Sequence, residues 1–139
     1  MLFRSRDSKI GDNCEIGPYS NIRNHSEIKN NCRIGNFVEV KKSFIGENTK
    51  CAHLSYIGDC KIEENVNIGC GVIIANYDGK NKNPCFIGKN SFIGCNSILI
   101  SPITINENSF VAAGTIVNKN LDKNSFAISR SELKISKRK

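Results

Sequence analysis

Large aliphatic residues recur every six residues along most of this chain, and this period limits the possible folds more than any other feature. With two single-residue slips, the first series runs through Ile10, Ile16, Ile22, Ile28, Ile34, Val40, Ile45, Cys51, Ile57, Ile62, Ile68 and Ile74. After the polar interruption at 75–86, it resumes at Ile87, Ile93, Leu99, Ile105, Val111 and Val117. An amphipathic α-helix would repeat near 3.6 residues. The pattern therefore indicates a repeat protein built from short strands.

A small or β-branched residue follows most of these aliphatic residues four positions later. These residues are Ser20, Ser26, Cys32, Val38, Thr49, Ser55, Val66, Val72, Ser91, Ser97, Ser109 and Thr115. One large and one small inward residue per hexad fit a short flat strand and a turn. Three hexads close a triangular coil, and stacked coils pair as parallel strands about 4.8 Å apart. Frequent Gly, Asn and Asp residues supply the left-handed conformations that the corners need.

The predicted fold is an all-β, left-handed parallel β-helix of about six coils. Its hand is inferred from similarity to known hexapeptide-repeat proteins, because parallel crossovers are usually right-handed. We expect an N-terminal leader or cap at 1–9, the β-helix domain at 10–122 and a basic tail at 123–139. The polar interruption predicts a loop at one corner. Flat prism sides bury little surface alone, so a homotrimer with clefts between chains is expected.

Composition narrows the partners and the location. The 139-residue chain is of single-domain length and carries a net charge of +7, which fits nucleic acid, a membrane surface or phosphorylated small molecules. It has no apolar run of membrane-spanning length, and its start lacks the apolar stretch of a signal peptide, so a cytoplasmic location is expected. The seven cysteines form no CxxC pair and are expected to be reduced and mostly structural.

His53 is the candidate general base. It lies two residues after the inward Cys51, so its side chain is expected to point outward. An imidazole titrates near neutral pH and can deprotonate an attacking amine. The alternative is a plain surface histidine, which is our interpretation of His25, but cations and a tyrosine surround His53 on nearby coils. Glu39 is either a residue that orients His53 or an ion-pair partner.

Phosphate-binding candidates are Arg23, Lys41 and Lys82, because guanidinium and ammonium groups bind phosphate oxygens. Arg23 and Lys41 are eighteen residues apart, which places them on one face, one coil apart. Tyr56 and Asn67 could donate hydrogen bonds to sugar hydroxyls. The alternative for each is a solvated corner residue. No P-loop or GxGxxG motif is present, and two histidines give little support for a shared zinc site.

Six motifs, in this order and at this spacing, closely resemble a single family: GNFVEVKK, KCAHLSYIGD, NVNIGCG, ANYDGKNK, AAGT and AISR. The family is the acetyltransferase domain of bifunctional N-acetylglucosamine-1-phosphate uridyltransferase/glucosamine-1-phosphate acetyltransferase. The resemblance covers about residues 10 to 130. It implies a trimer that transfers acetyl from acetyl-CoA to the 2-amino group of glucosamine 1-phosphate, in UDP-N-acetylglucosamine biosynthesis. No metal, nucleic acid or membrane is implied.

The resemblance also assigns residues. It makes His53 the proton acceptor. The sugar-phosphate positions are Arg23, Lys41, Tyr56, Asn67 and Lys82. The acetyl-CoA positions are Cys70, Asn76, Tyr77, Cys95, Ala113 and Arg130. The family more often has Ala and Ser where this chain has Cys70 and Cys95, so we expect acetyl-CoA binding to be sensitive to thiol modification.

The family's uridyltransferase domain is missing, so this chain is expected to have no uridyltransferase activity. Three origins stay open: a stand-alone acetyltransferase, a partner of a separate uridyltransferase, or a truncated protein. A second enzymatic interpretation keeps the scaffold but acetylates another amino sugar or a nucleotide-linked one. A third, from a different class, is a non-catalytic trimeric scaffold that binds polyanions.

Overall fold

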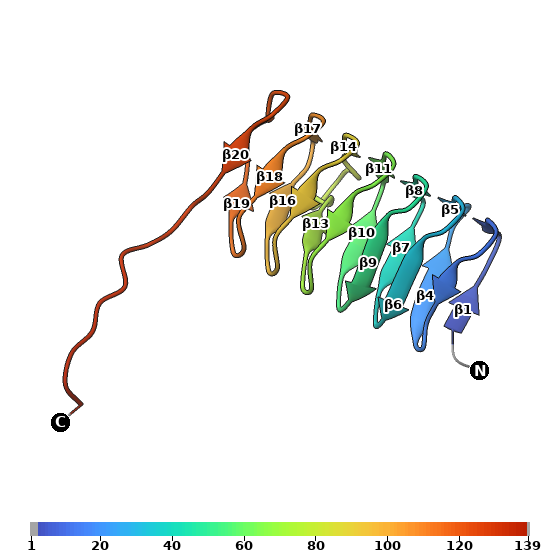
Figure 1. Ribbon diagram of the computed structural model, residues 1–139, viewed down its shortest axis with the longest axis horizontal. Helices are drawn as coiled ribbons and strands as arrows, with labels where there is room; N and C mark the ends of the chain where they lie inside the picture. Colours follow the sequence, from blue (N-terminus) through green and yellow to red (C-terminus); the bar gives the residue numbers. More distant parts are fainter. Residues whose placement is uncertain (1–2, 139) are drawn as a thin grey trace.

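The protein is a three-sided parallel β-solenoid, and its computed structural model describes residues 3–138 (Figure 1). Met1, Leu2 and Lys139, which belong to the expected leader and tail, lie outside the described residues. Within residues 3–138 there is no α-helix, and the twenty strands pair only in parallel inside three sheets. This arrangement confirms the predicted parallel β-helix; its hand stays a prediction.

Each sheet forms one side of the solenoid, and we call the sides faces A, B and C. Face A contains β1 (Phe3–Ser5), β4 (Ser20–Arg23), β7 (Glu39–Lys41), β10 (Tyr56–Gly58), β13 (Ile73–Ala75), β16 (Ile98–Ile100) and β19 (Ile116–Val117). Face B contains β2 (Lys9–Ile10), β5 (Glu27–Ile28), β8 (Phe44–Ile45), β11 (Cys60–Ile62), β14 (Cys85–Ile87) and β17 (Ile103–Ile105). Face C contains β3 (Glu15–Ile16), β6 (Arg33–Asn36), β9 (Lys50–His53), β12 (Asn67–Ile68), β15 (Phe92–Ile93), β18 (Phe110–Val111) and β20 (Phe126–Ala127).

The solenoid has about seven coils rather than the six expected, since faces A and C each hold seven strands and face B holds six. The extra strands are β1 and β20. Their sequences are Phe-Arg-Ser and Phe-Ala, without the aliphatic residue that marks the other hexads. Counting aliphatic residues therefore missed both ends of the solenoid.

The aliphatic series forms the core, as predicted. Residues such as Ile22, Ile57 and Leu99 have no solvent exposure, and they stack in register from coil to coil. The small residues are buried as well, and their hydroxyls bond to backbone carbonyls. Ser55 Oγ, for example, donates to the His53 carbonyl oxygen at 2.8 Å. These bonds satisfy most of the buried hydroxyls, although Ser101 Oγ is buried without a hydrogen-bond partner among the described residues.

Asparagines explain much of the corner geometry. Asn48 and Asn65, one coil apart, both adopt left-handed backbone conformations with φ of 58° and 56°. Asn tolerates this region better than other non-glycine residues because its short side chain can hydrogen-bond locally. The abundance of Asn in the sequence therefore has a structural cause, as expected.

Two segments leave the solenoid. Residues 76–84, between β13 and β14, form the predicted corner loop, which a Tyr77–Lys82 bridge closes. Residues 128–138 extend away from the last coil without regular structure (Figure 1). None of the described residues forms a helix with the length and hydropathy of a bilayer-spanning segment.

Candidate functional site

Face A carries a polar surface on its N-terminal strands. Arg23 of β4 and Lys41 of β7 are register partners, which confirms the stacking predicted from their spacing. Glu39 is the register partner of Tyr56 on the next strand. The guanidinium of Arg23 donates through Nε to Glu39 Oε1 at 2.6 Å. Glu39 therefore orients Arg23 and not His53, because the guanidinium lies on the adjacent strand of the same face.

A second group of side chains meets at the corner between faces A and B. Lys41 Nζ lies 3.2 Å from Asp59 Oδ2, and the amide of Asn76 donates to the same oxygen at 2.5 Å. The Asn76 amide also lies 3.4 Å from the Tyr56 hydroxyl. We call Lys41, Tyr56, Asp59 and Asn76 the corner cluster. It joins two predicted phosphate-site residues to one predicted acetyl-CoA residue.

Sequence reasoning missed Asp59. A usable signal existed, because Asp59 lies eighteen residues after Lys41 and seventeen before Asn76. Both intervals correspond to one coil, so the same spacing rule that joined Arg23 to Lys41 would have found it.

The corner loop holds Tyr77 and Lys82 together. Lys82 Nζ lies 3.8 Å from the centroid of the Tyr77 ring, a cation–π distance. The Tyr77 hydroxyl donates to the Gly79 carbonyl oxygen at 2.7 Å. The loop is further fixed by Asp78, whose carboxylate accepts hydrogen bonds from the backbone N–H of Asn81, the Asn83 amide and the Lys80 N–H. These bonds lower the pKa of Asp78 to about 2.

His53 occupies the opposite corner, between faces C and A, at the end of β9. It is the register partner of Asn36, and its exposed side chain points outward as predicted. Cys70, Cys95 and Ala113 follow on successive coils, each two residues after an inward aliphatic residue, and backbone bonds link these coils. The Asn96 N–H donates to the Cys70 carbonyl at 2.8 Å, and the Gly114 N–H to the Cys95 carbonyl at 2.7 Å. We call His53, Cys70, Cys95 and Ala113 the corner column.

Of the two remaining predicted residues, Asn67 lies apart from both groups, and Arg130 lies beside Gly114, the residue after Ala113 of the corner column. Asn67 sits on face C, with Lys50 and Phe92 as its register partners. Arg130 lies where the tail begins, with its Nη1 atom 3.8 Å from the position that a Cβ on Gly114 would occupy. Within a single chain, β10 (Tyr56–Gly58) runs from the corner of His53 to the corner of Asp59.

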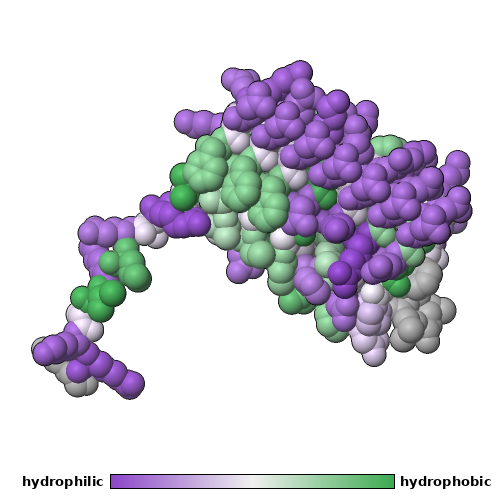
Figure 2. Space-filling model, viewed as in Figure 1, coloured by the Kyte–Doolittle hydropathy of each residue, from purple (hydrophilic) through white to green (hydrophobic). Residues whose placement is uncertain are grey.

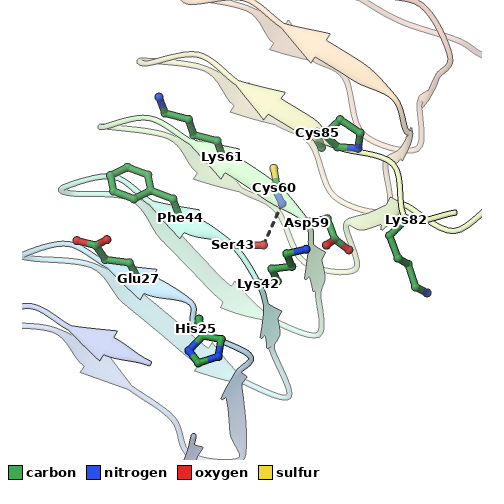
Figure 3. Close-up of a pocket in the computed structure, with 11 residues that line it drawn as sticks. His25, Glu27, Lys42, Ser43, Phe44, Asp59, Cys60, Lys61, Lys82 and Cys85 are labelled. Carbon is green, nitrogen blue, oxygen red and sulfur yellow. Dashed lines mark hydrogen bonds between the residues drawn. The ribbon is translucent and has the colours of Figure 1, made fainter. Parts of the chain in front are cut away.

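An open groove of about 690 Å³ borders the corner cluster on the side of face B (Figure 3). Its polar rim includes Lys42, Lys61, Asp59 and Lys82, and Phe44 contributes an aromatic surface. In Figure 3, Lys82 extends away from the other labelled side chains. His25 also lines the groove and is exposed.

The cysteines divide by burial. All seven are free thiols. Burial raises the pKa of Cys51 to about 12 and also raises the pKa of Cys60, whose register partner is the buried Cys85. Cys95 is exposed and Cys70 is partly exposed. The two thiols of the corner column are therefore more accessible to solvent than the buried core thiols.

Comparison with known proteins places the fold in a family. The model of the bacterial transferase hexapeptide family, of six repeats, matches residues 7–42 and 84–119, just over half of the chain. The chain belongs to the bacterial hexapeptide transferases. In this family the hexad is the structural repeat found above, so the match and the solenoid agree.

Curated relatives of this hexapeptide transferase include the bifunctional protein GlmU of Clostridium perfringens, which is 49% identical over 126 residues. GlmU of Caldicellulosiruptor saccharolyticus is 52% identical over 124 residues. The alignments cover 91% and 89% of this chain but only 28% and 27% of the relatives, so the chain spans little more than a quarter of their length. These identities confirm the resemblance inferred from the motifs.

Solved structures share the fold at lower identity. A mutant of AntD, an N-acyltransferase from Bacillus cereus, in complex with dTDP and coenzyme A, matches 94% of this chain and 84% of its own, with a TM-score of 0.77 and 22% identity. A mutant of GDP-perosamine N-acetyl transferase from Caulobacter crescentus matches 87% of this chain and 54% of its own, with a TM-score of 0.66 and 18% identity. Both support the β-solenoid of the hexapeptide transferase.

Proposed function

We propose that this chain transfers the acetyl group of acetyl-CoA to the 2-amino group of glucosamine 1-phosphate, giving N-acetylglucosamine 1-phosphate. Its identity to GlmU supports an acetyltransferase. The observation that carries the acceptor is the polar surface of face A. There Arg23 and Lys41 stack one coil apart beside Tyr56, which suits a phosphate next to sugar hydroxyls. Asn67 and Lys82 complete the proposed acceptor site.

His53 is the proposed general base. The amine nitrogen attacks the thioester carbonyl carbon, forming the C–N bond, and His53 accepts the amine proton. The C–S bond then breaks, and the leaving CoA sulfur takes a proton back from the imidazolium. The side chain of His53 is exposed, and within residues 3–138 its ring has no hydrogen-bond partner, so it can reach a substrate. We assign the oxyanion to the backbone N–H of Cys70, the next residue of the corner column.

The corner column is the proposed path of acetyl-CoA. Its residues are small beyond His53, so an extended acyl donor can lie along successive coils. Asn76 and Tyr77 would contact the donor from the loop, and Arg130 supplies a cation for a phosphate of CoA. Cys70 and Cys95 would then line the donor site. The residues hold a flexible co-substrate close to the amine, which can lower a barrier by up to roughly 7–11 kcal/mol in favourable cases.

A homotrimer is the proposed assembly, because face A lies between the corner of His53 and the corner of Asp59, and a neighbouring chain could bring the two kinds of corner together. The C-terminal half of the solenoid offers apolar surface for such contacts (Figure 2). On face A, Ile73, Ile100 and Ile116 are about half exposed. On face C, Phe92 stacks on Phe110, and Phe110 on Phe126, with centroids 4.8 and 5.7 Å apart. Exposed apolar rows of this extent mark an interaction surface.

A thiol-release assay with acetyl-CoA and glucosamine 1-phosphate tests the proposal. His53→Ala should lower turnover by about 10²–10⁴-fold if the imidazole is the base. His25→Ala is the matched control, because His25 is the other histidine and lies at a different corner. The His53→Ala variant should keep the mass of the proposed trimer and its affinity for acetyl-CoA. Full activity of His53→Ala would remove His53 from the mechanism.

The same assay with UDP-linked amino sugars tests the second enzymatic interpretation. Higher turnover of such an acceptor than of glucosamine 1-phosphate would replace the proposed substrate. A protein that neither binds acetyl-CoA nor releases thiol, but adheres to polyanions in a salt-sensitive way, would support the non-catalytic scaffold. A separate uridyltransferase would be the partner that consumes the product.

A further inference from the structure

We propose that Asp59, with Gly58, positions both halves of the site: the phosphate-binding residues of face A and the acyl-donor residues of the corner loop. The inference rests on the proposed function, since it takes the roles of Lys41, Tyr56 and Asn76 from there. Asp59 itself is not assigned a contact with either substrate. It acts through Lys41 and Asn76, which it bonds directly, and reaches Tyr56 only through Asn76.

A single carboxylate oxygen links residues from three coils. Asp59 Oδ2 accepts from Lys41 Nζ at 3.2 Å and from the Asn76 amide at 2.5 Å. Lys41 belongs to β7, Asp59 follows β10, and Asn76 follows β13. The side chains of Lys41 and Asp59 are only 14% and 11% exposed, so the pair is largely shielded from solvent. Shielded charge-assisted bonds of this kind fix side-chain geometry more strongly than exposed pairs do.

The pair still leaves donors for a ligand. An ammonium group has three N–H bonds, and Asp59 takes one, so Lys41 can donate the others to a phosphate. The opposite charge beside Lys41 also offsets its repulsion from Arg23, its register partner. Asp59 thus holds the Lys41 ammonium in a position where it can still donate hydrogen bonds to a phosphate.

The second hydrogen bond of Asp59 fixes the side chain of Asn76, and Asn76 in turn holds the corner loop. The side chain of Asn76 is buried, and both of its amide contacts are within the corner cluster. The backbone carbonyl oxygen of Asn76 accepts the backbone N–H of Asn83 at 2.7 Å, near the other end of the loop. Orientation of Asn76 by Asp59 therefore also fixes the base of the loop that carries Tyr77 and Lys82.

Gly58 leaves the space that this arrangement needs. A Cβ on Gly58 would lie 2.4 Å from the Tyr56 hydroxyl and 2.7 Å from the Asn76 amide nitrogen. Side-chain atoms cannot approach a Cβ that closely, so the Tyr56 ring could not lie over this residue. Two contacts therefore come from the Tyr-Ile-Gly-Asp segment. Tyr56 lies over Gly58, and Asp59 bonds Lys41 on the preceding coil and Asn76 on the following coil.

The first test compares Asp59→Asn with Glu27→Gln in steady-state kinetics. Asp59→Asn keeps the shape but removes the charge, and it should raise KM for glucosamine 1-phosphate and KM for acetyl-CoA, each by about tenfold. Glu27→Gln removes another carboxylate paired with a lysine, in the exposed Lys29 pair at 2.7 Å, and should change neither. A fall in kcat with both KM values unchanged would indicate general structural damage and would overturn the proposal.

A second measurement shows whether Asp59 acts through its neighbours. In a Lys41→Ala/Asn76→Ala background, adding Asp59→Asn should have no further effect on either KM. A further tenfold rise there would overturn the proposal, because Asp59 would then contact substrate itself or act by another route. Gly58→Ala should reproduce the Asp59→Asn pattern while Asp59 is intact; unchanged KM values would remove Gly58 from the proposal.

Amide hydrogen exchange gives a readout that does not depend on activity. Residues 76–84 should exchange faster in Asp59→Asn than in the unmodified protein, and at an unchanged rate in Glu27→Gln. If the unmodified protein fails to acetylate glucosamine 1-phosphate, the proposed function fails, and loop exchange still decides whether Asp59 positions Asn76. Unchanged exchange in Asp59→Asn overturns the positioning role whatever the activity.

Discussion

Replacement of Ile57 by alanine tests whether the solenoid is held together by its aliphatic column. Ile57 lies on β10 in the middle of the molecule, has no solvent exposure, and is the register partner of Val40. Removal of its three outer carbons leaves a cavity that neighbouring coils cannot fill, because each rung is fixed by backbone bonds to the next. A fully buried Ile→Ala change costs about 2–5 kcal/mol, and we expect the upper half of that range here.

Urea unfolding measures this cost. Ile57→Val removes one methyl group and should cost about 0.5–1.5 kcal/mol. Ile135→Ala makes the same change in the exposed tail and should stay within about 0.5 kcal/mol of the unmodified protein. All variants need one protein concentration, because the proposed assembly would contribute to apparent stability. A cost below about 1 kcal/mol for Ile57→Ala would refute the tightly packed column.

Three further outcomes are expected. Size-exclusion chromatography with light scattering should give three times the chain mass of 15.4 kDa, and a monomer would contradict the proposed intersubunit site. Mass spectrometry after brief alkylation at pH 8 should find Cys95 modified and Cys51 unmodified, because Cys51 is buried and its pKa is raised to about 12; prior acetyl-CoA should protect Cys95. The pKa of Asp78 is lowered to about 2, so its contribution to loop order is fully present above its unfolded value near 4 and is lost as pH falls towards 2. Hydrogen exchange of residues 76–84 should therefore accelerate below pH 3 relative to the intrinsic rate, and Asp78→Asn should show the faster exchange already at pH 7.

The core could be predicted from the sequence because period and geometry correspond directly. A residue six positions on lies on the next face, and one about eighteen positions on lies above, so Ile57 and its series had to point inward. The same rule placed Arg23 over Lys41. It failed at β1 and β20, where the strands close the solenoid without a hexad aliphatic residue. End coils pack on one side only, so their sequences are less constrained.

The candidate site was less predictable, because the direction and bonding of polar side chains do not follow from the repeat. Glu39 could have oriented His53 or served as an ion-pair partner, and only the structure places its carboxylate on Arg23. Asp59 could have been found from its spacing, but the room that Gly58 provides for Tyr56 could not. That close contact depends on the tilt of one aromatic ring. The assigned roles of the site residues stay predictions until the kinetic tests are made.

The corner loop adds candidate site residues to the solenoid without changing the register of its coils. Across it, Cys70 and Cys95 are 25 residues apart, yet they occupy adjacent coils of the corner column, since Ile68 and Ile93 are register partners. The insertion therefore adds Tyr77 and Lys82 at one corner without disturbing the column at the other. A repeat scaffold can accept such an insertion because each coil contacts only its neighbours. At the base of the loop, backbone groups leave the sheet and lose their sheet hydrogen bonds. The bonds of Asn76 to Asp59 and to the Asn83 N–H lie at this point. The packing of the loop base and the geometry of the site thus depend on the same corner. Asp59→Asn should therefore loosen the loop and raise the KM for both substrates.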